Sequence, residues 1–459
     1  MSLLALDLND AAITVTGEGG VLYREPGFVL LDNQRLVAGD AAYRRARLQP
    51  RHIHDRFWTE LDVEALPDTR FRHLTAADLA SRQLEQAWSA AAAAGEAGAA
   101  VVAAVPGYME TPQLGLFLGI CRELGIPVAG LVDAAIAATR HEYVGAVPVH
   151  VDVSLHSTLL TRVGQPTRAQ VEKSAVVADS GLVALYDAWI RVISAAFVRQ
   201  SRFDPLHTAE TEQRLYDLLP GWLDAAATDG SVQAVLEHRG LTHTADIDVL
   251  TLIAAAAPVY HRIVGQLRAL CRAGDVPALQ LTDRAARLPG LADMLKARAG
   301  GEVFLLEPGA TGRGLLARCR HLSPGGEHVT LVRQLPWDQA PVTFALAREE
   351  ASATGRPSHV LFRNHAWALN GQPLNVGTQP VPGERWIEVD ATMPGVSRRH
   401  CSIELSSGQC VLRDHSRFGT FLNGHRLDGS ATLQAGDEVR VGTPGFELRL
   451  ITAEQDHAP

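Results

Sequence analysis

The order of hydrophobic and polar positions predicts alternating strands and helices in the first 150 of the 459 residues. The continuous apolar run 99–105 ends at a proline, as a buried strand does, and helical spacing follows over residues 111–124. A short strand is expected at 128–132 and a hairpin at 147–162. This alternation is typical of an α/β domain.

The middle of the chain has a different pattern. Apolar residues recur at the i, i+3, i+4 spacing of amphipathic helices. This spacing covers residues 182–200, 210–226 and 247–272. We therefore expect the region from about 175 to 300 to be mostly helical.

The pattern changes again near the C-terminus. Residues 359–452 break into short strand-like runs separated by Gly, Pro, Asn and Asp, which is typical of a β-sandwich or barrel. Because the chain is longer than one hydrophobic core usually supports, we expect two domains. The predicted boundaries are 1–340 for the α/β domain, 341–356 for a linker and 357–455 for the all-β domain.

Composition and charge narrow the classes of function. A net charge of −9 argues against a nucleic-acid partner, because phosphate backbones require clustered Lys and Arg. No apolar run is long enough to span a membrane. The five cysteines show no paired spacing, which favours a reduced, cytoplasmic chain. We find no hydrolase motif and no metal-ligand spacing, so we expect no catalytic residue and no metal site.

Four short segments of the first 340 residues resemble the actin/Hsp70 ATPase superfamily. They are Leu4-Ala5-Leu6-Asp7-Leu8, residues 101–108 (VVAAVPGY), Val149-His150-Val151-Asp152 and residues 286–291 (ARLPGL). A fifth segment, residues 126–143, is similar to the part of an Hsp70 domain that follows VVAAVPGY. The resemblance implies a two-lobed α/β domain of the ribonuclease H-like kind. In that superfamily the two aspartate-bearing strands bind the phosphates of ATP, with Mg²⁺.

The glycines that such a site requires are missing here. Phosphate-binding hairpins need backbone N–H groups that no Cβ obstructs, but the chain has Asp7-Leu8-Asn9 and Ser154-Leu155-His156 at the two hairpins. Asp283-Arg284 replaces the paired glycines beside the adenosine. ATP and Mg²⁺ are therefore disfavoured as cofactors, and the domain is expected to be a degenerate ATPase rather than an enzyme.

The two remaining carboxylates, Asp7 and Asp152, allow two interpretations. They could hold a metal–nucleotide in an altered cleft, or they could cap turns, which Asp does readily and which we favour. A further hypothesis is that Asp283 and Arg284 fill the adenosine pocket with an internal ion pair.

Two loop segments near the C-terminus carry the most specific chemistry. Ser397-Arg398-Arg399-His400 and Ser416-Arg417-Phe418-Gly419-Thr420 resemble the recognition loops of a forkhead-associated (FHA) domain, a β-sandwich that binds phosphothreonine. The resemblance implies phosphopeptide contacts at Ser397, Arg398, Arg417, Phe418 and Thr420, and loop-bracing roles for His400 and Asn423. Arg399 is expected at the flank or in an edge salt bridge.

Two departures from the FHA pattern affect the expected site. Thr378 stands where the family usually has an arginine, which removes a planar, bidentate phosphate donor. Phe418 replaces the asparagine that usually precedes Gly-Thr. Arg398 and Arg417 could compensate. Three interpretations stay open: a phosphothreonine reader, a phosphate-independent interaction domain and a structural appendage.

Together these features predict an adaptor or scaffold. The FHA-like module would bind a protein partner, with or without a phosphothreonine, and the degenerate Hsp70-like domain would serve as an interaction platform. The alternative is a divergent Hsp70-like ATPase regulated through its FHA domain. By association with the FHA family, bacterial Ser/Thr kinase signalling or secretion assemblies are implied as the context.

Overall fold

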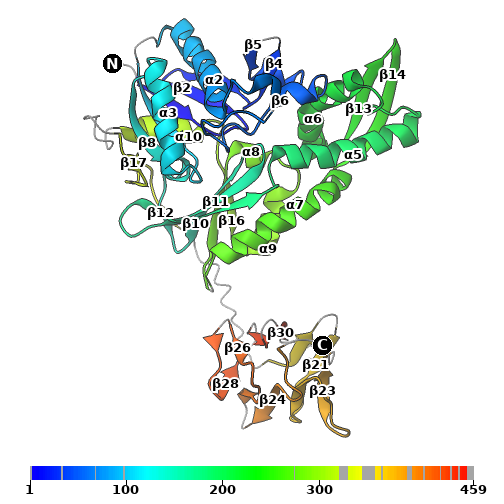
Figure 1. Ribbon diagram of the computed structural model, residues 1–459. Coiled ribbons are helices and arrows are strands. Elements are labelled where there is room, and N and C mark those ends of the chain that lie inside the picture. Colours follow the sequence, from blue (N-terminus) through cyan, green and yellow to red (C-terminus); the bar gives the residue numbers. More distant parts are fainter. Residues whose placement is uncertain are drawn as a thin grey trace, which may run out of the picture. The chain divides into compact units, whose positions relative to one another are not determined.

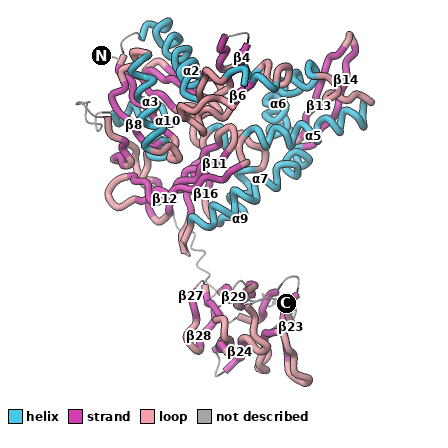
Figure 2. The backbone as a smooth tube through the Cα atoms, in the orientation of Figure 1, coloured by secondary structure: helices cyan, strands magenta, loops and turns pink. Residues whose placement is uncertain are grey.

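The computed structural model describes residues 3–32, 35–67, 69–96, 99–272, 274–319, 329–343, 357–362, 365–389, 395–406, 409–423, 425–434, 437–442 and 445–451. The chain divides into two compact units, Met1–Thr343 and Phe344–Pro459. The first unit mixes helices and strands, and the described part of the second contains strands and loops (Figures 1 and 2). The mixed α/β class expected for the N-terminal part is confirmed.

Two six-stranded sheets form the frame of the first unit. The first sheet has the order β17 (Leu331–Val332), β8 (Val128–Asp133), β7 (Ala100–Val105), β1 (Leu3–Asp7), β2 (Ile13–Gly17), β3 (Gly20–Glu25). The second has the order β16 (Glu302–Leu305), β15 (Pro277–Leu281), β10 (Val147–Val153), β11 (Ser157–Gly164), β12 (Ala169–Ala178), β18 (Gln334–Leu335).

The two sheets repeat one topology. In each, three consecutive strands form an antiparallel meander, and two later strands add in parallel beside the first strand of that meander. Each meander starts with an aspartate-bearing strand, β1 with Asp7 and β10 with Asp152. The repeat places these two carboxylates at equivalent positions in the two sheets.

Ten α-helices are assigned in the described part of the first unit. They are α1 (Asp40–Tyr43), α2 (Ala76–Ala91), α3 (Thr111–Glu123), α4 (Ala134–Ala138), α5 (Leu182–Ser201), α6 (Ala209–Asp229), α7 (Val249–Leu270), α8 (Asp283–Ala286), α9 (Leu291–Ala299) and α10 (Ala310–Arg318). The smaller strands are β4 (Val29–Asp32), β5 (Arg35–Ala38), β6 (Ile53–His54), β9 (Tyr143–Val144) and β19 (Val342–Thr343). Because β19 pairs with β9, the first unit continues to Thr343.

The expected helical region contains one hairpin that the sequence analysis did not predict. Strands β13 (Ser231–His238) and β14 (Leu241–Asp248) pair along their whole length and lie at the far ends of α5 and α6 from the sheets (Figure 1). The prediction of a helix from 247 was wrong at its start because Ile247 belongs to this hairpin. Alternating burial along the strand, with Ala245 and Ile247 inside, is the strand pattern that was missed.

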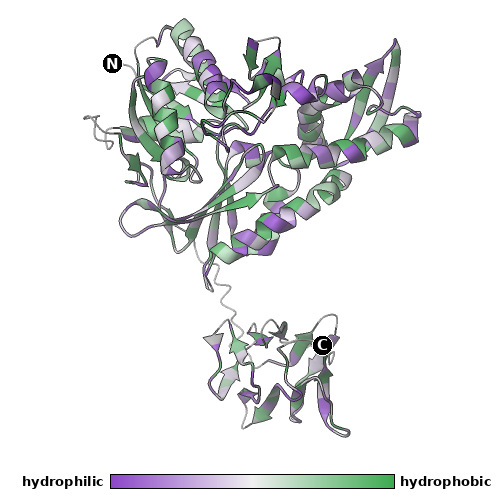
Figure 3. Ribbon diagram, viewed as in Figure 1, coloured by the Kyte–Doolittle hydropathy of each residue, from purple (hydrophilic) through white to green (hydrophobic). Residues whose placement is uncertain are grey.

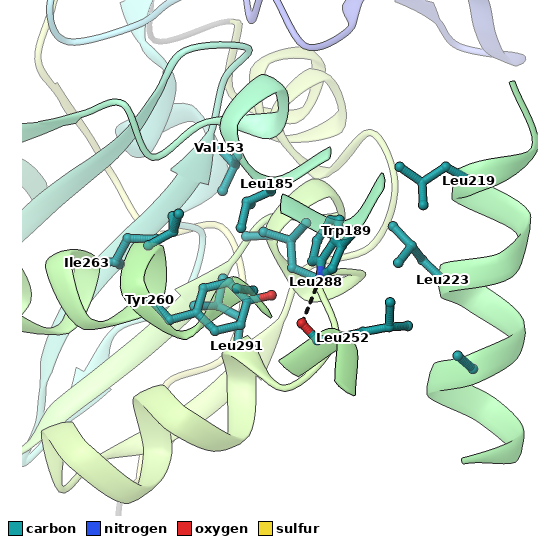
Figure 4. Close-up of a cluster of buried hydrophobic side chains, with 14 of the residues drawn as sticks. Val153, Leu185, Trp189, Leu219, Leu223, Leu252, Tyr260, Ile263, Leu288 and Leu291 are labelled. Atoms are coloured by element: carbon teal, nitrogen blue, oxygen red, sulfur yellow. Dashed lines mark hydrogen bonds between the residues drawn. The ribbon is translucent and has the colours of Figure 1, made fainter. Parts of the chain in front are cut away.

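The largest hydrophobic core lies between the second sheet and helices α5, α6, α7 and α9. Helices α5 and α7 alternate hydrophobic and hydrophilic positions, visible as green and purple in Figure 3. Trp189 is fully buried at the centre of this core, where its indole N–H donates to the carbonyl of Leu252 at 2.8 Å (Figure 4). Such a partner removes the cost of burying the indole N–H.

The second unit is a β-sandwich, as expected. One sheet has the order β21 (His365–Ala368), β20 (His359–Phe362), β30 (Phe446–Ile451), β29 (Glu438–Val441), β26 (Thr420–Leu422), β27 (His425–Arg426). The other has the order β23 (Arg385–Glu388), β22 (Leu374–Gly377), β24 (Cys401–Ser406), β25 (Gln409–Asp414), β28 (Ser430–Leu433). Alternate residues of both sheets, such as Val376, Ile403 and Val439, fill the core between them.

Candidate functional site

Three loops of the sandwich meet at Ser397. Its backbone carbonyl accepts a hydrogen bond from the Thr378 N–H at 3.4 Å, in the loop that follows β22. Its hydroxyl oxygen accepts a hydrogen bond from the Arg417 N–H at 3.2 Å, in the loop between β25 and β26. Ser397 is a partly exposed residue, and the hydrogen of its hydroxyl can still donate to a ligand.

Gly377 allows the loops to approach this closely. A Cβ at this position would lie 2.2 Å from the carbonyl oxygen of Arg398, a distance that no side chain tolerates. The same carbonyl accepts a hydrogen bond from the Gln379 N–H at 3.1 Å. The end of β22 therefore fixes the backbone of the loop that carries Ser397 and Arg398.

The buried His400 side chain connects the loop that carries Ser397 with the loop that carries Gly419. It is fully buried; its Nδ1 accepts a hydrogen bond from the Ser397 N–H at 3.0 Å, and its Nε2 lies 3.1 Å from the Gly419 carbonyl. Because Nδ1 is the acceptor, the hydrogen must be on Nε2, which assigns the neutral tautomer. Burial lowers the pKa of His400, which agrees with a neutral imidazole.

Asn423 and Thr420 also hold the loops through side-chain hydrogen bonds. The Asn423 side chain accepts a hydrogen bond from the Glu438 N–H at 2.9 Å and donates to Asp437 at 2.8 Å. Thr420 is fully buried, and its hydroxyl donates to Asp414 at 2.7 Å. The FHA resemblance implied a peptide contact for Thr420. Its hydroxyl donates to Asp414 within the fold, and a contact between Thr420 and the peptide stays a prediction.

The exposed side of the loops carries two arginines and a phenylalanine. Arg398, Arg417 and Phe418 are exposed, and Phe418 retains 51% of its accessible surface. Neither the Arg398 nor the Arg417 guanidinium has a hydrogen-bond or ion-pair partner among the described residues. Arg399 differs, since it donates to Asn375 at 2.7 Å and lies 3.9 Å from the Glu384 carboxylate, the edge position expected for it. Two positive charges beside Ser397 are therefore available to an anion.

A second candidate site lies between the two sheets of the first unit, where Arg284 fills the space between Asp7 and Asp152. Its Nη2 donates to Asp152 Oδ2 at 2.9 Å and its Nε to Asp152 Oδ1 at 3.2 Å. Its Nη1 and Nη2 both lie 3.4 Å from Asp7 Oδ2. All three side chains are less than a tenth exposed.

Further hydrogen bonds join the two sheets at this point. The Asn9 amide donates to Asp152 Oδ2 at 2.8 Å, and Asp10 Oδ1 accepts from the Leu155 N–H at 2.8 Å. Each hairpin thus contributes one of the residues that replace its glycines, Asn9 or Leu155, to a hydrogen bond across the cleft. The cavity beside Asp7 and Arg284 has a volume of about 10 Å³, which is at the lower limit of what can hold one water molecule.

The electrostatics distinguish the two carboxylates. Burial raises the pKa of Asp152, but the Arg284 charge and its hydrogen bonds outweigh burial, so the pKa is lowered and the group stays ionised. For Asp7, burial outweighs the longer contacts with Arg284 and raises the pKa to about 6. Asp152 is therefore the principal partner of Arg284.

Two hypotheses on this cleft need correction. Asp7 and Asp152 do not serve mainly as turn caps, because Arg284 binds both of them. Arg284 also does not pair with its neighbour Asp283, which instead binds Arg24 at 2.7 Å. An internal arginine does fill the cleft, but its partners are the two strand aspartates. The contact between Arg24 and Asp283 could not be predicted from the sequence, because it joins residues 259 positions apart.

Comparison with known proteins identifies part of the second unit. Residues 384–442 match the family model of the FHA domain, and no curated protein matches the chain. Within the described residues no helix is both long and apolar enough to cross a membrane, and no group of three or more His, Cys, Asp or Glu side chains could hold a metal ion. The match includes the Ser397 and Arg417 loops, so the second unit contains an FHA domain, a module for protein interaction through phosphothreonine peptides.

Proposed function

We propose that the chain is an adaptor whose FHA domain binds a threonine-phosphorylated segment of a partner protein through Ser397, Arg398 and Arg417. The observation that carries this proposal is the contact of the Ser397 hydroxyl with the Arg417 backbone N–H. It joins two loops whose exposed arginines, Arg398 and Arg417, have no partner for their guanidinium groups among the described residues. A phosphate at this position would gain charge-assisted hydrogen bonds, each worth roughly 1.5–3 kcal/mol.

Thr378 makes the proposed site different from the usual FHA site. A threonine cannot donate the two parallel hydrogen bonds of an arginine. Arg398 and Arg417 supply the charge from the other two loops, and the buried His400 fixes the backbone on which Ser397 sits. The proposed reader therefore takes its charge from two side chains instead of one.

For the first unit, the proposal is an actin/Hsp70-like platform that presents an interaction surface and does not use ATP. Its support is the repeated sheet topology, with an aspartate on the first strand of each meander. The guanidinium of Arg284 occupies the space between those aspartates, which argues against the alternative of a divergent ATPase. Isothermal titration of the full chain with Mg-ATP should give no heat of binding.

Peptide binding by the full chain tests the FHA proposal. A fluorescein-labelled phosphothreonine peptide library of degenerate sequence is titrated by fluorescence anisotropy, with the dephosphorylated library beside it. Ser397→Ala should weaken binding about tenfold or more, and Arg398→Ala or Arg417→Ala should each have an effect of similar size, because a lost charge-assisted bond costs about 1.4 kcal/mol or more. Arg399→Ala is the matched control and should change affinity less than about twofold.

The outcomes separate the three interpretations of the module. Equal binding of both libraries would support a phosphate-independent interaction domain. Binding of neither library would favour a structural appendage. Loss of affinity in Arg399→Ala equal to that in Arg398→Ala would mean that diffuse positive charge, and not the Ser397 site, attracts the phosphate.

A further inference from the structure

The first unit contains a cavity of about 650 Å³ that neither the adaptor proposal nor the comparisons assign. Its walls come from β3, α1, α5, α6 and α8 with the loops next to them. Small-molecule sites in proteins typically enclose roughly 300–1,000 Å³. The cavity therefore has the size of a small-molecule site.

Most of the positive charge in the wall is already neutralised. Of the four lining arginines, Arg24 binds Asp283 at 2.7 Å and Arg47 binds Asp187 at 2.9 Å. Arg284 is held by the two strand aspartates described above. Only Arg287 has no carboxylate partner among the described residues of the chain.

The negative charge of the wall is not neutralised in the same way. Glu25, Asp40, Asp55 and Asp224 line the cavity without an arginine or lysine partner among the described residues. Asp55 has only the imidazole of His156 beside it, at 3.2 Å. These carboxylates come from different elements, Glu25 from β3, Asp40 from α1 and Asp224 from α6. The wall is therefore acidic on more than one side.

Aromatic rings supply much of the remaining surface. Phe28 and Tyr43 meet edge to face at 5.3 Å between ring centroids, and Tyr186 lies 6.5 Å from Tyr216. The Arg47 guanidinium already lies over the Tyr216 ring, 3.6 Å from its centroid. The wall thus binds one cation through an aromatic face, an interaction worth about 0.5–2 kcal/mol.

From this combination we propose that the cavity binds an organic cation of the aliphatic polyamine class. Ammonium groups would pair with carboxylates on opposite elements, Asp224 on α6 and Asp40 or Glu25 on α1 and β3. The methylene segments would pack on the tyrosine rings and on apolar lining residues such as Leu182 and Leu288. An anionic ligand would meet repulsion from the same carboxylates.

A pair of probes of equal length tests the charge requirement. The full chain is titrated by isothermal calorimetry with 1,8-diaminooctane and with 1,8-octanediol, which has hydroxyls in place of the amines. The diamine should bind at least about tenfold more tightly, a difference of about 1.4 kcal/mol. Asp224→Asn should reduce diamine affinity severalfold, and Tyr186→Leu should do the same by removing an aromatic face.

The control variant is Asp229→Asn. Asp229 lies on the same helix as Asp224, is exposed and does not line the cavity. Its substitution removes the same charge from the chain and should leave diamine affinity unchanged; thermal melts verify that each variant is folded. The proposal fails if diol and diamine bind equally, if no diamine binding is measured, or if Asp229→Asn weakens binding as much as Asp224→Asn does.

Discussion

Replacing Arg284 by methionine should destabilise the first unit strongly. The substitution keeps an unbranched side chain but removes the guanidinium that binds Asp152 at 2.9 Å and Asp7 at 3.4 Å. Both carboxylates are less than a tenth exposed, so water cannot replace the lost charge. Removing one partner of a buried ion pair typically costs about 3–5 kcal/mol. We expect a loss of that size in the free energy of unfolding at pH 7.5.

A compensating variant separates the charge effect from the loss of packing. In the triple variant Arg284→Met, Asp7→Asn, Asp152→Asn no buried charge remains, and replacing all members of a buried ionic network is often close to neutral. The triple variant should therefore regain most of the stability that Arg284→Met loses. The penalty of Arg284→Met should also shrink at acidic pH, because both carboxylates then accept protons.

Urea unfolding of the full chain provides the assay. Far-UV circular dichroism at the helix signal follows the first unit, because helices are assigned only there in the described residues. The midpoint and slope give the free energy of unfolding for each variant. A loss below about 1 kcal/mol for Arg284→Met, or no recovery in the triple variant, would refute the idea that Arg284 neutralises the cleft.

Three further predictions concern single residues. The pKa of Asp7 is about 6 in the folded chain and about 4 in the unfolded chain, so the free energy of unfolding should fall as pH rises from 4 to 6. Asp7→Asn should remove this dependence and stabilise the chain at pH 7.5 by up to about 3 kcal/mol, measured by urea unfolding at pH 4 and pH 7.5. Because burial lowers the pKa of His400, the FHA domain should lose stability as pH falls below about 6.5, and calorimetry of His400→Gln should show a weaker pH dependence. Gly377→Ala, whose Cβ would lie 2.2 Å from the Arg398 carbonyl, should weaken phosphopeptide binding by about tenfold or more in the anisotropy assay.

The recognition loops were the part of the site most accessible to sequence reasoning. Their turn residues and short strands limit the backbone, so the meeting of Ser397 and Arg417 follows from the resemblance. The role of Thr420 did not follow, because a threonine beside a turn has the same sequence whether its hydroxyl faces a ligand or a buried carboxylate. Its partner Asp414 precedes it by six residues, at the end of β25, a strand of the other sheet.

The cleft of the first unit depends on contacts between residues far apart in the sequence, which could not be predicted. Three missing glycine positions argued against phosphate binding, but they did not identify what takes the place of the phosphate. That depends on which arginine reaches Asp152 across 132 positions of sequence. The hairpin β13–β14 was missed for a local reason, since its short alternating strands lie between two long helices in a region that was expected to be mostly helical.

Because Arg284 fills the cleft, a nucleotide should bind there with a reduced affinity. A triphosphate that used the space between Asp7 and Asp152 would have to displace Arg284 from both carboxylates. It would then leave two ionised or partly ionised groups facing its own negative charge, at a cost of about 3–5 kcal/mol. Since each 1.4 kcal/mol is tenfold in affinity, this cost raises a dissociation constant about 10²- to 10³-fold or more. A micromolar site would become a millimolar one, as the proposed ATP-independent platform requires.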